Sequence, residues 1–208
     1  MTRYGMAIDT LFCVGCDQCS VACKVEHNLP DGVWWTRART SSDPDGFACG
    51  RPEGTYPNLK SSWYTSACQH CDNPPCLEVC PTGATAKRED GIVVVDQSVC
   101  IGCKSCIAAC PYDARTLLEG EPAWALEFPV GDQEAPEHIA QTTEKCTFCV
   151  ERIDRGERPA CVDVCQAVAR YFGDLDDPNS EVSKVLAERD YDQLLADQGT
   201  SPNVYFLK

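Results

Sequence analysis

Short apolar runs, separated by polar and glycine-rich turns, predict strands at several points of this chain. The β-branched run 92–95 follows Asp90-Gly91, a dipeptide typical of tight turns, so residues 85–96 are expected to form a hairpin. Residues 3–9 and 168–173 are two further strand candidates, and we expect them to pair with each other. The pattern therefore indicates short β elements near both ends of the chain and in its middle.

Helical signals gather in the C-terminal tail, residues 174–208. The sequence Asp176-Asp-Pro-Asn-Ser is typical of a helix start and predicts a helix over 181–188. A second helix is expected to pass through Leu194 and Leu195. The apolar run 204–207 is expected to lie on the body of the protein or on a partner.

Two long segments stand outside this pattern. Residues 29–66 contain Trp34, Trp35 and Trp63 and are expected to form two strands joined by a long glycine-, proline- and serine-rich loop. Residues 117–143 are acidic and hold three prolines, which predicts a surface loop. Long loops in compact domains are usually functional or mobile. Both segments are therefore candidate docking surfaces, with shielding of a buried centre as the alternative.

The charge and the motif content exclude several functions. The formal net charge is −14, whereas a nucleic-acid surface needs clustered Lys and Arg, so no nucleic-acid partner is expected. No phosphate loop, nucleophile elbow or dinucleotide fingerprint is present. We therefore expect a chain that is no enzyme by itself. Its acidity favours solubility or attraction to a basic face of a partner.

The sequence also bears on membranes and export. No apolar run approaches the roughly 20 residues that a membrane span needs, so no direct span is expected. The first residues have no signal-type apolar region, and the chain contains no Arg-Arg pair. If the protein works outside the cytoplasm, we expect a partner to carry it there already folded.

Cysteine gives the strongest chemical signal. Sixteen of the seventeen cysteines form four quartets, of which the first and third have the spacing of bacterial iron–sulfur proteins. In chain order the quartets are Cys13, Cys16, Cys19 and Cys23; Cys68, Cys71, Cys76 and Cys80; Cys100, Cys103, Cys106 and Cys110; and Cys146, Cys149, Cys161 and Cys165. Such closely spaced thiolates can hold three corners of an iron–sulfur cube, so we expect four [4Fe–4S] clusters and a role in electron transfer.

Two other uses of these cysteines were weighed. A disulfide framework is disfavoured because the spacing already assigns sixteen thiols to metal. Four structural zinc sites are disfavoured because zinc prefers paired Cys-x2-Cys knuckles, whereas these quartets crowd three thiols together. The remaining thiol, Cys49, is expected to be a passive free cysteine, with a reactive or intermolecular role as the alternative.

The fourth cysteine of each quartet is expected to bind the cluster of a paired quartet, as in ferredoxins. The second and third quartets form one pair and the first and fourth form the other. Pro81 and Pro111 follow the last cysteines of the inner pair, matching the bacterial motif, whereas Lys24 and Gln166 replace proline in the outer pair. The expected ligand sets are site 1 (Cys13, Cys16, Cys19, Cys165), site 2 (Cys68, Cys71, Cys76, Cys110), site 3 (Cys100, Cys103, Cys106, Cys80) and site 4 (Cys146, Cys149, Cys161, Cys23).

These pairs predict an α+β fold of two ferredoxin-like units in pseudo-symmetric arrangement, with loop insertions and the short helical tail. The expected organisation is an outer unit (1–28 with 144–173), an inserted strand and loop segment (29–66), an inner unit (67–116), an acidic loop (117–143) and the tail (174–208). Because sites and fold form together in metal-built domains, cluster loss is expected to unfold the chain.

Four other residues were considered for a role beside the clusters. Lys104 is expected to be a solvated lysine, with tuning of a cluster potential as the alternative. His70 is expected to make a loop hydrogen bond, with a proton-coupled or quinone-contacting role as the alternative. His27 and His138 lack metal-ligand spacing and are expected at the surface.

Several short sequence motifs flank or overlap the quartets. They include Gly5-Met-Ala-Ile-Asp9, Cys68-Gln-His-Cys-Asp-Asn-Pro-Pro-Cys76, Val79-Cys-Pro-Thr-Gly-Ala84, Lys87-Arg-Glu-Asp-Gly91, Thr143-Glu-Lys-Cys-Thr-Phe-Cys149, Pro159-Ala-Cys-Val-Asp163 and Gly173-Asp-Leu-Asp-Asp-Pro178. With them the chain resembles the four-cluster iron–sulfur subunit of molybdopterin oxidoreductases, the group of dimethyl sulfoxide, polysulfide, tetrathionate and respiratory arsenate reductases. The last three of these motifs are most similar to those of the arsenate reductase type. The resemblance covers nearly the whole chain.

This resemblance implies partners and a place of work. It implies a large catalytic subunit with a molybdenum or tungsten bis-pterin cofactor, with site 1 nearest to it. It places site 3 farthest away, towards a quinol-oxidising membrane anchor or another donor. It also implies the outer, periplasmic face of the cytoplasmic membrane, reached by co-export with a signal-bearing partner, with the cytoplasm as the alternative. Two other functions stay open: a cluster-carrying subunit of a hydrogenase or formate-lyase type complex, and a structural metal-binding module.

Overall fold

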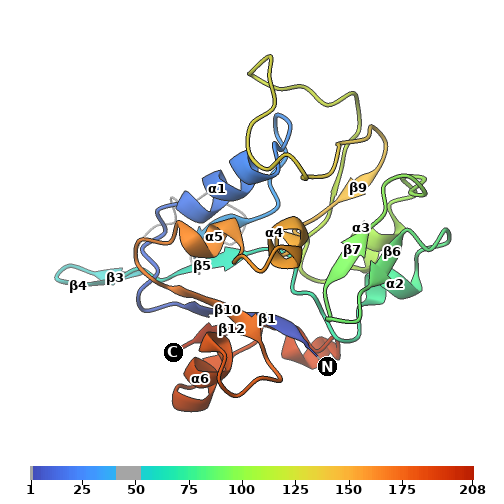
Figure 1. The fold of residues 1–208 in the computed structure, drawn as a ribbon. Helices are drawn as coiled ribbons and strands as arrows, with labels where there is room; N and C mark the ends of the chain where they lie inside the picture. Colours follow the sequence, from blue (N-terminus) through green and yellow to red (C-terminus); the bar gives the residue numbers. More distant parts are fainter. Residues whose placement is uncertain (1, 41–52) are drawn as a thin grey trace.

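A four-stranded mixed sheet, in the order β10-β1-β12-β11, joins the two ends of the chain (Figure 1). The computed structural model describes residues 2–40 and 53–208. Strand β1 (Tyr4–Asp9) runs antiparallel to β10 (Arg170–Asp174) and parallel to β12 (Val204–Leu207), which pairs with β11 (Tyr191–Asp192). The expected pairing of segments 3–9 and 168–173 is therefore confirmed.

The two faces of this sheet pack against different helices because strand side chains alternate. Met6 and Ile8 of β1 lie on one face, in an apolar cluster shared with α4 (Val150–Asp154) and α5 (Ala160–Asp163). Ala7 lies on the other face, against α6 (Glu181–Glu188). In Figure 1, α4 and α5 lie above the sheet and α6 lies below it. A packed aliphatic and aromatic core therefore exists beside the cysteines.

Four two-stranded pairs complete the β structure of the described residues. They are β2 (Arg37–Thr40) with β5 (Trp63–Ser66), β3 (Glu53–Thr55) with β4 (Asn58–Lys60), β6 (Thr85–Lys87) with β7 (Val93–Val95), and β8 (Thr116–Leu117) with β9 (Thr143–Glu144). The β6–β7 hairpin and the β2–β5 pair confirm the strands expected in 85–96 and 29–66. The loop expected around Ser41–Gly46, and Cys49, lie outside the described residues.

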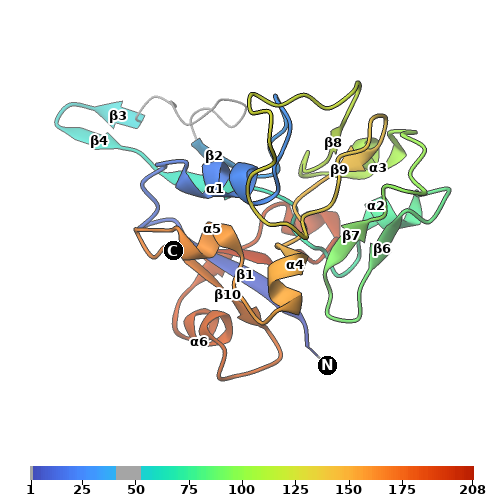
Figure 2. The same ribbon diagram turned by 45° about the horizontal axis from the view of Figure 1, so that its top comes forward.

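Three further helices each begin within a cysteine quartet: α1 (Gln18–Glu26), α2 (Pro75–Glu78) and α3 (Ser105–Ala109). Helix α1 packs on α5, whereas α2 and α3 pack together beside the β6–β7 hairpin. Figure 2 shows these as two groups on either side of α4. No helix of the described residues is long and apolar enough to cross a membrane.

The C-terminal tail differs in part from its prediction. The helix over 181–188 is confirmed as α6, and its first turn is capped by the Ser180 hydroxyl, which accepts from the Ser183 amide at 3.1 Å. The prediction of a second helix through Leu194 and Leu195 is wrong. Leu194 packs on the apolar cluster of the sheet, and Leu195 has a left-handed backbone before a short 3₁₀ turn, Ala196–Gln198. The run 204–207 does lie on the body of the protein, as a strand.

Candidate metal centres

The sixteen described cysteines are free thiols, and they gather at four cavities. Each cavity is lined by all four thiols of one predicted set. The cavity volumes are about 400, 340, 320 and 480 Å³ for sites 1, 2, 3 and 4. Within the described part of the chain, no three His, Cys, Asp or Glu side chains lie close enough to hold a single metal ion. The structure thus brings each set together around a space, while ligation stays a prediction.

The loops of the first and third quartets use the same backbone geometry. Gly15 and Gly102 both have φ +64°, and Asp17 and Lys104, two residues later, have φ 58° and 62°. A Cβ on Gly15 would lie 2.2 Å from the Trp63 ring, and one on Gly102 would lie 2.2 Å from a backbone oxygen. Left-handed residues turn the chain sharply, so the three thiols that follow one another can face one point.

The other two quartets share a different local feature. His70 and Phe148 occupy equivalent places in Cys68–Cys71 and Cys146–Cys149, and both are left-handed, with φ 43° and 58°. Their rings stack on each other, with centroids 3.7 Å apart. The two loops therefore meet face to face at the middle of the protein.

His70 makes the loop hydrogen bond that was expected. Its Nδ1 accepts from the Val93 amide at 3.1 Å, and the side chain is fully buried. Burial, then the nearby Lys145 and Arg115, lower the pKa of His70 well below its usual value. The imidazole is therefore neutral at physiological pH.

Burial of the thiols opposes their ionisation. It raises the pKa of Cys71 to about 12, with a further contribution from Cys68, and that of Cys146 to about 12, with a contribution from Cys161. Cys80 differs: burial is outweighed by the Thr85 amide, by the hydroxyl and amide of Thr82 and by the Ala84 amide, which lower its pKa to about 7. Thiolate ligands must be deprotonated, so iron would bind the buried sets in competition with protons.

The four sites differ in their access to solvent. Cys16 of site 1 and Cys103 of site 3 are exposed, whereas Cys23 and Cys149 of site 4 are buried, as are three thiols of site 2. Neighbouring cavities share lining residues: Arg170 lines sites 1 and 4, Cys68 lines sites 4 and 2, and Arg115 lines sites 2 and 3. The sites therefore form a row, 1-4-2-3, with the most exposed thiols at its ends.

Two histidines were predicted wrongly as surface residues. His27 is 2% exposed, packs in a tilted arrangement against Trp35 with ring centroids 4.6 Å apart, and places Nε2 3.3 Å from Cys149 Sγ. The His138 side chain is 3% exposed, with Nδ1 2.5 Å from Glu144 Oε1. No spacing pattern marks them, because the turn after α1 and the acidic loop bring them inward. Lys104, by contrast, is exposed and paired with Glu119 at 3.3 Å, as expected for a solvated lysine.

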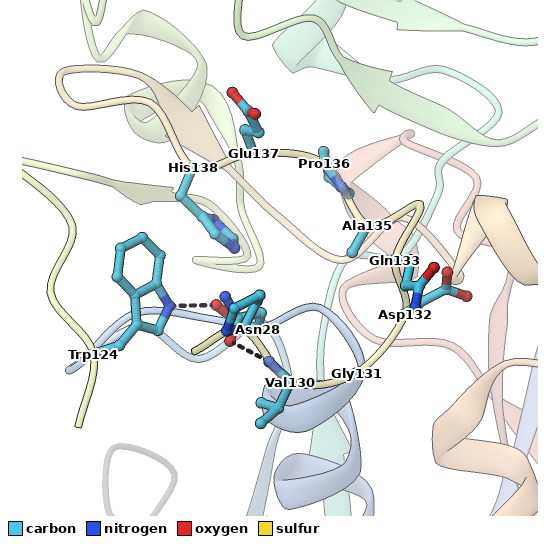
Figure 3. A pocket seen from close by; sticks show the side chains of 11 residues that line it. Asn28, Trp124, Val130, Gly131, Asp132, Gln133, Ala135, Pro136, Glu137 and His138 are labelled. Atoms are coloured by element: carbon cyan, nitrogen blue, oxygen red, sulfur yellow. Dashed lines mark hydrogen bonds between the residues drawn. The ribbon is translucent and has the colours of Figure 1, made fainter. Parts of the chain in front are cut away.

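An open surface pocket, about 1200 Å³ including the space open to solvent, lies away from all four sites against the acidic loop. Figure 3 shows its wall, where Trp124 Nε1 donates to the Asn28 carbonyl and the Val130 amide donates to the Asn28 side chain. His138 also lines this cavity, whereas no cysteine does. The surface loop predicted over 117–143 is thus fastened to the end of α1.

Sequence reasoning missed the buried cations beside the thiols. Arg115 donates to Cys76 Sγ at 3.0 Å, Arg170 lies 3.5 Å from Cys161 Sγ, and Lys145 donates to the Cys146 carbonyl at 2.9 Å. A signal was available: Arg115 stands five residues after Cys110, and Arg170 stands five residues after Cys165. The last cysteines of the third and fourth quartets are thus followed by arginine at the same distance.

The sequence of the chain is similar to one family profile and to several known proteins. The profile of the 4Fe-4S dicluster domain matches residues 59–121 and 133–175. The chain is 46% identical to a putative dimethyl sulfoxide reductase iron–sulfur subunit of Halobacterium salinarum, covering 100% of this chain and 79% of that protein. It is 37% identical to the arsenate respiratory reductase iron–sulfur subunit of Shewanella sp. strain ANA-3, covering 99% and 96%. It is 36% identical to one of the chains of the polysulfide reductase of Wolinella succinogenes, covering 99% and 94%.

Proposed function

Because the chain is a member of the family of iron–sulfur electron-transfer subunits of molybdopterin oxidoreductases, we propose that it carries four [4Fe–4S] clusters, one at each of sites 1 to 4. It is a non-catalytic subunit, and the catalytic part is a separate chain. When bound, each cluster supplies one-electron redox chemistry with no open coordination position. The hydrogenase or formate-lyase alternative is not favoured, since these relatives are named as parts of reductases.

One observation carries the proposal: four cavities, each lined by all four thiols of a set drawn from two paired quartets. Thiol groups around a cavity of this kind are the donor set that [4Fe–4S] clusters take. The equivalent left-handed residues of the first and third quartets, and the stacked His70 and Phe148, support two pseudo-symmetric ferredoxin-like units. We propose the division into an outer unit, 1–28 with 144–173, and an inner unit, 67–116, on the same grounds.

The row 1-4-2-3 supports a linear path for electrons. Sites 4 and 2 are buried and meet at Cys68, which lines both cavities. The ends are open, and each end carries exposed apolar side chains. Leu11 and Phe12 are 74% and 59% exposed beside site 1, and Ile101 is 65% exposed beside site 3. Apolar patches of this kind often mark protein interfaces.

We assign a partner to each end on the family resemblance. Site 1 faces a large catalytic subunit with a molybdenum or tungsten bis-pterin cofactor. Site 3 faces a quinol-oxidising membrane anchor or another electron donor. The complex works on the outer face of the cytoplasmic membrane, where the chain arrives with its catalytic partner. Recovery of the assembled complex only from the cytosol would contradict this location.

The first experiment is an anaerobic pull-down of the chain from its native cell, with metal analysis. We expect a much larger partner, molybdenum or tungsten, and about 16 irons per copy of this chain in addition to any in the partner. Iron with nickel, or iron without molybdenum or tungsten, would favour the hydrogenase type. Zinc without iron would favour a structural metal-binding module.

A second experiment tests the exchange of fourth ligands. Cys80→Ser is expected to damage site 3, although Cys80 lies in the second quartet of the sequence. Cys76→Ser serves as the matched variant from the same quartet and is expected to damage site 2. Spectra of the four clusters distinguish the results, and damage to site 2 in Cys80→Ser would show that the assignment is wrong.

A further inference from the structure

Three lysine or arginine side chains are buried among the described residues: Arg115 at 5% exposed, Lys145 at 2% and Arg170 at 7%. The other described lysines and arginines are half-buried or exposed. Burying a cation is costly unless a negative group accompanies it. The described hydrogen bonds of these three reach sulfur, hydroxyl and carbonyl atoms but no carboxylate.

Each of these cations lies in a different gap of the row 1-4-2-3. Arg170 lines the cavities of sites 1 and 4, and its charge interacts with thiols of both, Cys19 and Cys161 among them. Arg115 lines the cavities of sites 2 and 3 and interacts with Cys76 and Cys106. The charge of Lys145 reaches Cys146 of site 4 and Cys76 of site 2.

The local structure holds the three cations in these gaps. Arg170 begins β10 and shares the sheet face of Phe172, so strand alternation directs it towards the sites rather than towards α6. Arg115 is fixed by the Thr85 hydroxyl at 3.1 Å as well as by Cys76. Lys145 donates to the carbonyls of Val93 and Cys146.

We propose that Arg170, Lys145 and Arg115 are positioning charges for electron transfer, each raising the reduction potentials of the clusters on both sides of its gap. The inference rests on the four clusters of the proposed function. A cluster gains one negative charge on reduction, so a nearby buried cation favours its reduced form. The same charges offset the accumulation of four anionic clusters in an acidic chain.

The placement between clusters has a consequence for each transfer step. With clusters bound at both sites, one electron would pass from the reduced cluster to its oxidised neighbour, with no bond formed or broken and no proton moved. The summed charge of the two clusters stays constant, and the cation lies beside the electron before and after the step. The cation therefore raises the reduction potentials of both clusters together and leaves the difference between them nearly unchanged, so neither cluster of the pair retains the electron.

The test is an anaerobic redox titration of the cluster-loaded chain in its complex, with each cluster followed by electron paramagnetic resonance. In Arg115→Gln we expect the equilibrium constants for reduction of sites 2 and 3 to fall at least tenfold, which is about 59 mV for one electron. Sites 1 and 4 then serve as internal references. In Arg170→Gln we expect the equilibrium constants for reduction of sites 1 and 4 to fall, with sites 2 and 3 as references. In Lys145→Met we expect those of sites 4 and 2 to fall.

Two further variants separate charge from packing. Lys104→Gln also removes a positive charge beside Cys103, but Lys104 is 59% exposed and paired with Glu119, so its shift at site 3 is expected to be much smaller. Arg115→Lys keeps the charge and loses the planar fork, and we expect it to keep wild-type potentials. If Arg115→Gln fails to hold its clusters, retention of the clusters in Arg115→Lys would show that the loss follows from the missing charge.

The outcomes distinguish the inference from the function on which it rests. Fewer than four clusters in the wild-type chain would overturn the proposed function and the inference with it. Four clusters with unchanged potentials in Arg115→Gln and Arg170→Gln would overturn the inference alone. Equal shifts at all four sites, or loss of clusters in Arg115→Lys as in Arg115→Gln, would also overturn it.

Discussion

Leu207 tests whether the C-terminal strand holds the central sheet together. Its side chain is fully buried and packs with Ala7 of β1 and Val182 of α6. Its carbonyl accepts from the Thr10 hydroxyl at 2.8 Å, three residues before Cys13. Leu207→Ala would leave a cavity between β1, β12 and α6 while keeping the backbone bonds.

The expected magnitude follows from the three carbon atoms removed. At about 0.8 kcal/mol for each buried carbon, the lost transfer free energy is about 2.4 kcal/mol. The cavity adds to this, so we expect a total destabilisation of about 3 to 4 kcal/mol. Single domains have unfolding free energies of about 5 to 15 kcal/mol, so this change is a large share of the total.

The assay is the rate of unfolding of the cluster-loaded chain without oxygen, followed by circular dichroism and by the visible absorbance of the clusters. A kinetic measurement is needed because cluster loss makes unfolding irreversible. We expect the rate to rise by about 10- to 100-fold, since each 1.4 kcal/mol is worth up to tenfold. Leu195→Ala is the matched control, because Leu195 is 46% exposed and such a change costs about 0.5 kcal/mol or less. Equal rates for the two variants would refute the reasoning.

Three further predictions concern pH, a turn and the metal. Burial opposes protonation of His138, but the hydrogen bond and charge of Glu144 raise its pKa above 6.5; this pair stabilises the fold below pH 6.5, and the gain is lost as pH rises through the raised pKa. A pH series of unfolding rates is expected to show this component in the wild type and not in His138→Asn. Gly102→Ala is expected to accelerate cluster loss at site 3, because the new Cβ would meet the Gln141 carbonyl, whereas Gly120→Ala meets nothing within 4 Å and serves as control. Anaerobic removal of iron by a chelator is expected to lower the melting temperature, since the buried cations then lose their anionic neighbours; an unchanged melting temperature would contradict this coupling.

The sequence predicted most features that depend on residues close together in the chain. The hairpin around Asp90, the helix over 181–188 and the first three thiols of each cysteine set depend on spacing and turn residues within short segments. The fourth thiol of each set comes from the paired quartet and was predicted from the ferredoxin pattern. Strand β12 was missed as a strand because its longer pairing is with β1, at the other end of the chain, and its second partner, β11, has only two residues. Its four residues carry no turn or cap that distinguishes a paired strand from a surface patch.

The side chains that surround the thiols were harder to predict than the positions of the thiols themselves. The sequence does not reveal the burial of His27, because that burial depends on Trp35, which reaches it after the chain has turned back. Arg170 lies in a predicted strand, but strand alternation gives no face until the sheet partners are known. Packing between distant segments, rather than local preference, decided these positions.

The central sheet also constrains how the protein is made. Met6 pairs with both Phe172 and Val204, so residues 4–9 can complete the sheet only after these two distant strands have been synthesised. In the proposed ligand sets, site 1 takes Cys165 and site 4 takes Cys146, Cys149 and Cys161, so we expect both sites to be completed only after residue 165 has been made. Sites 2 and 3 draw on the continuous stretch 68–110 and are free to mature earlier. Maturation factors would thus meet a nascent chain whose middle is ready for iron before its ends.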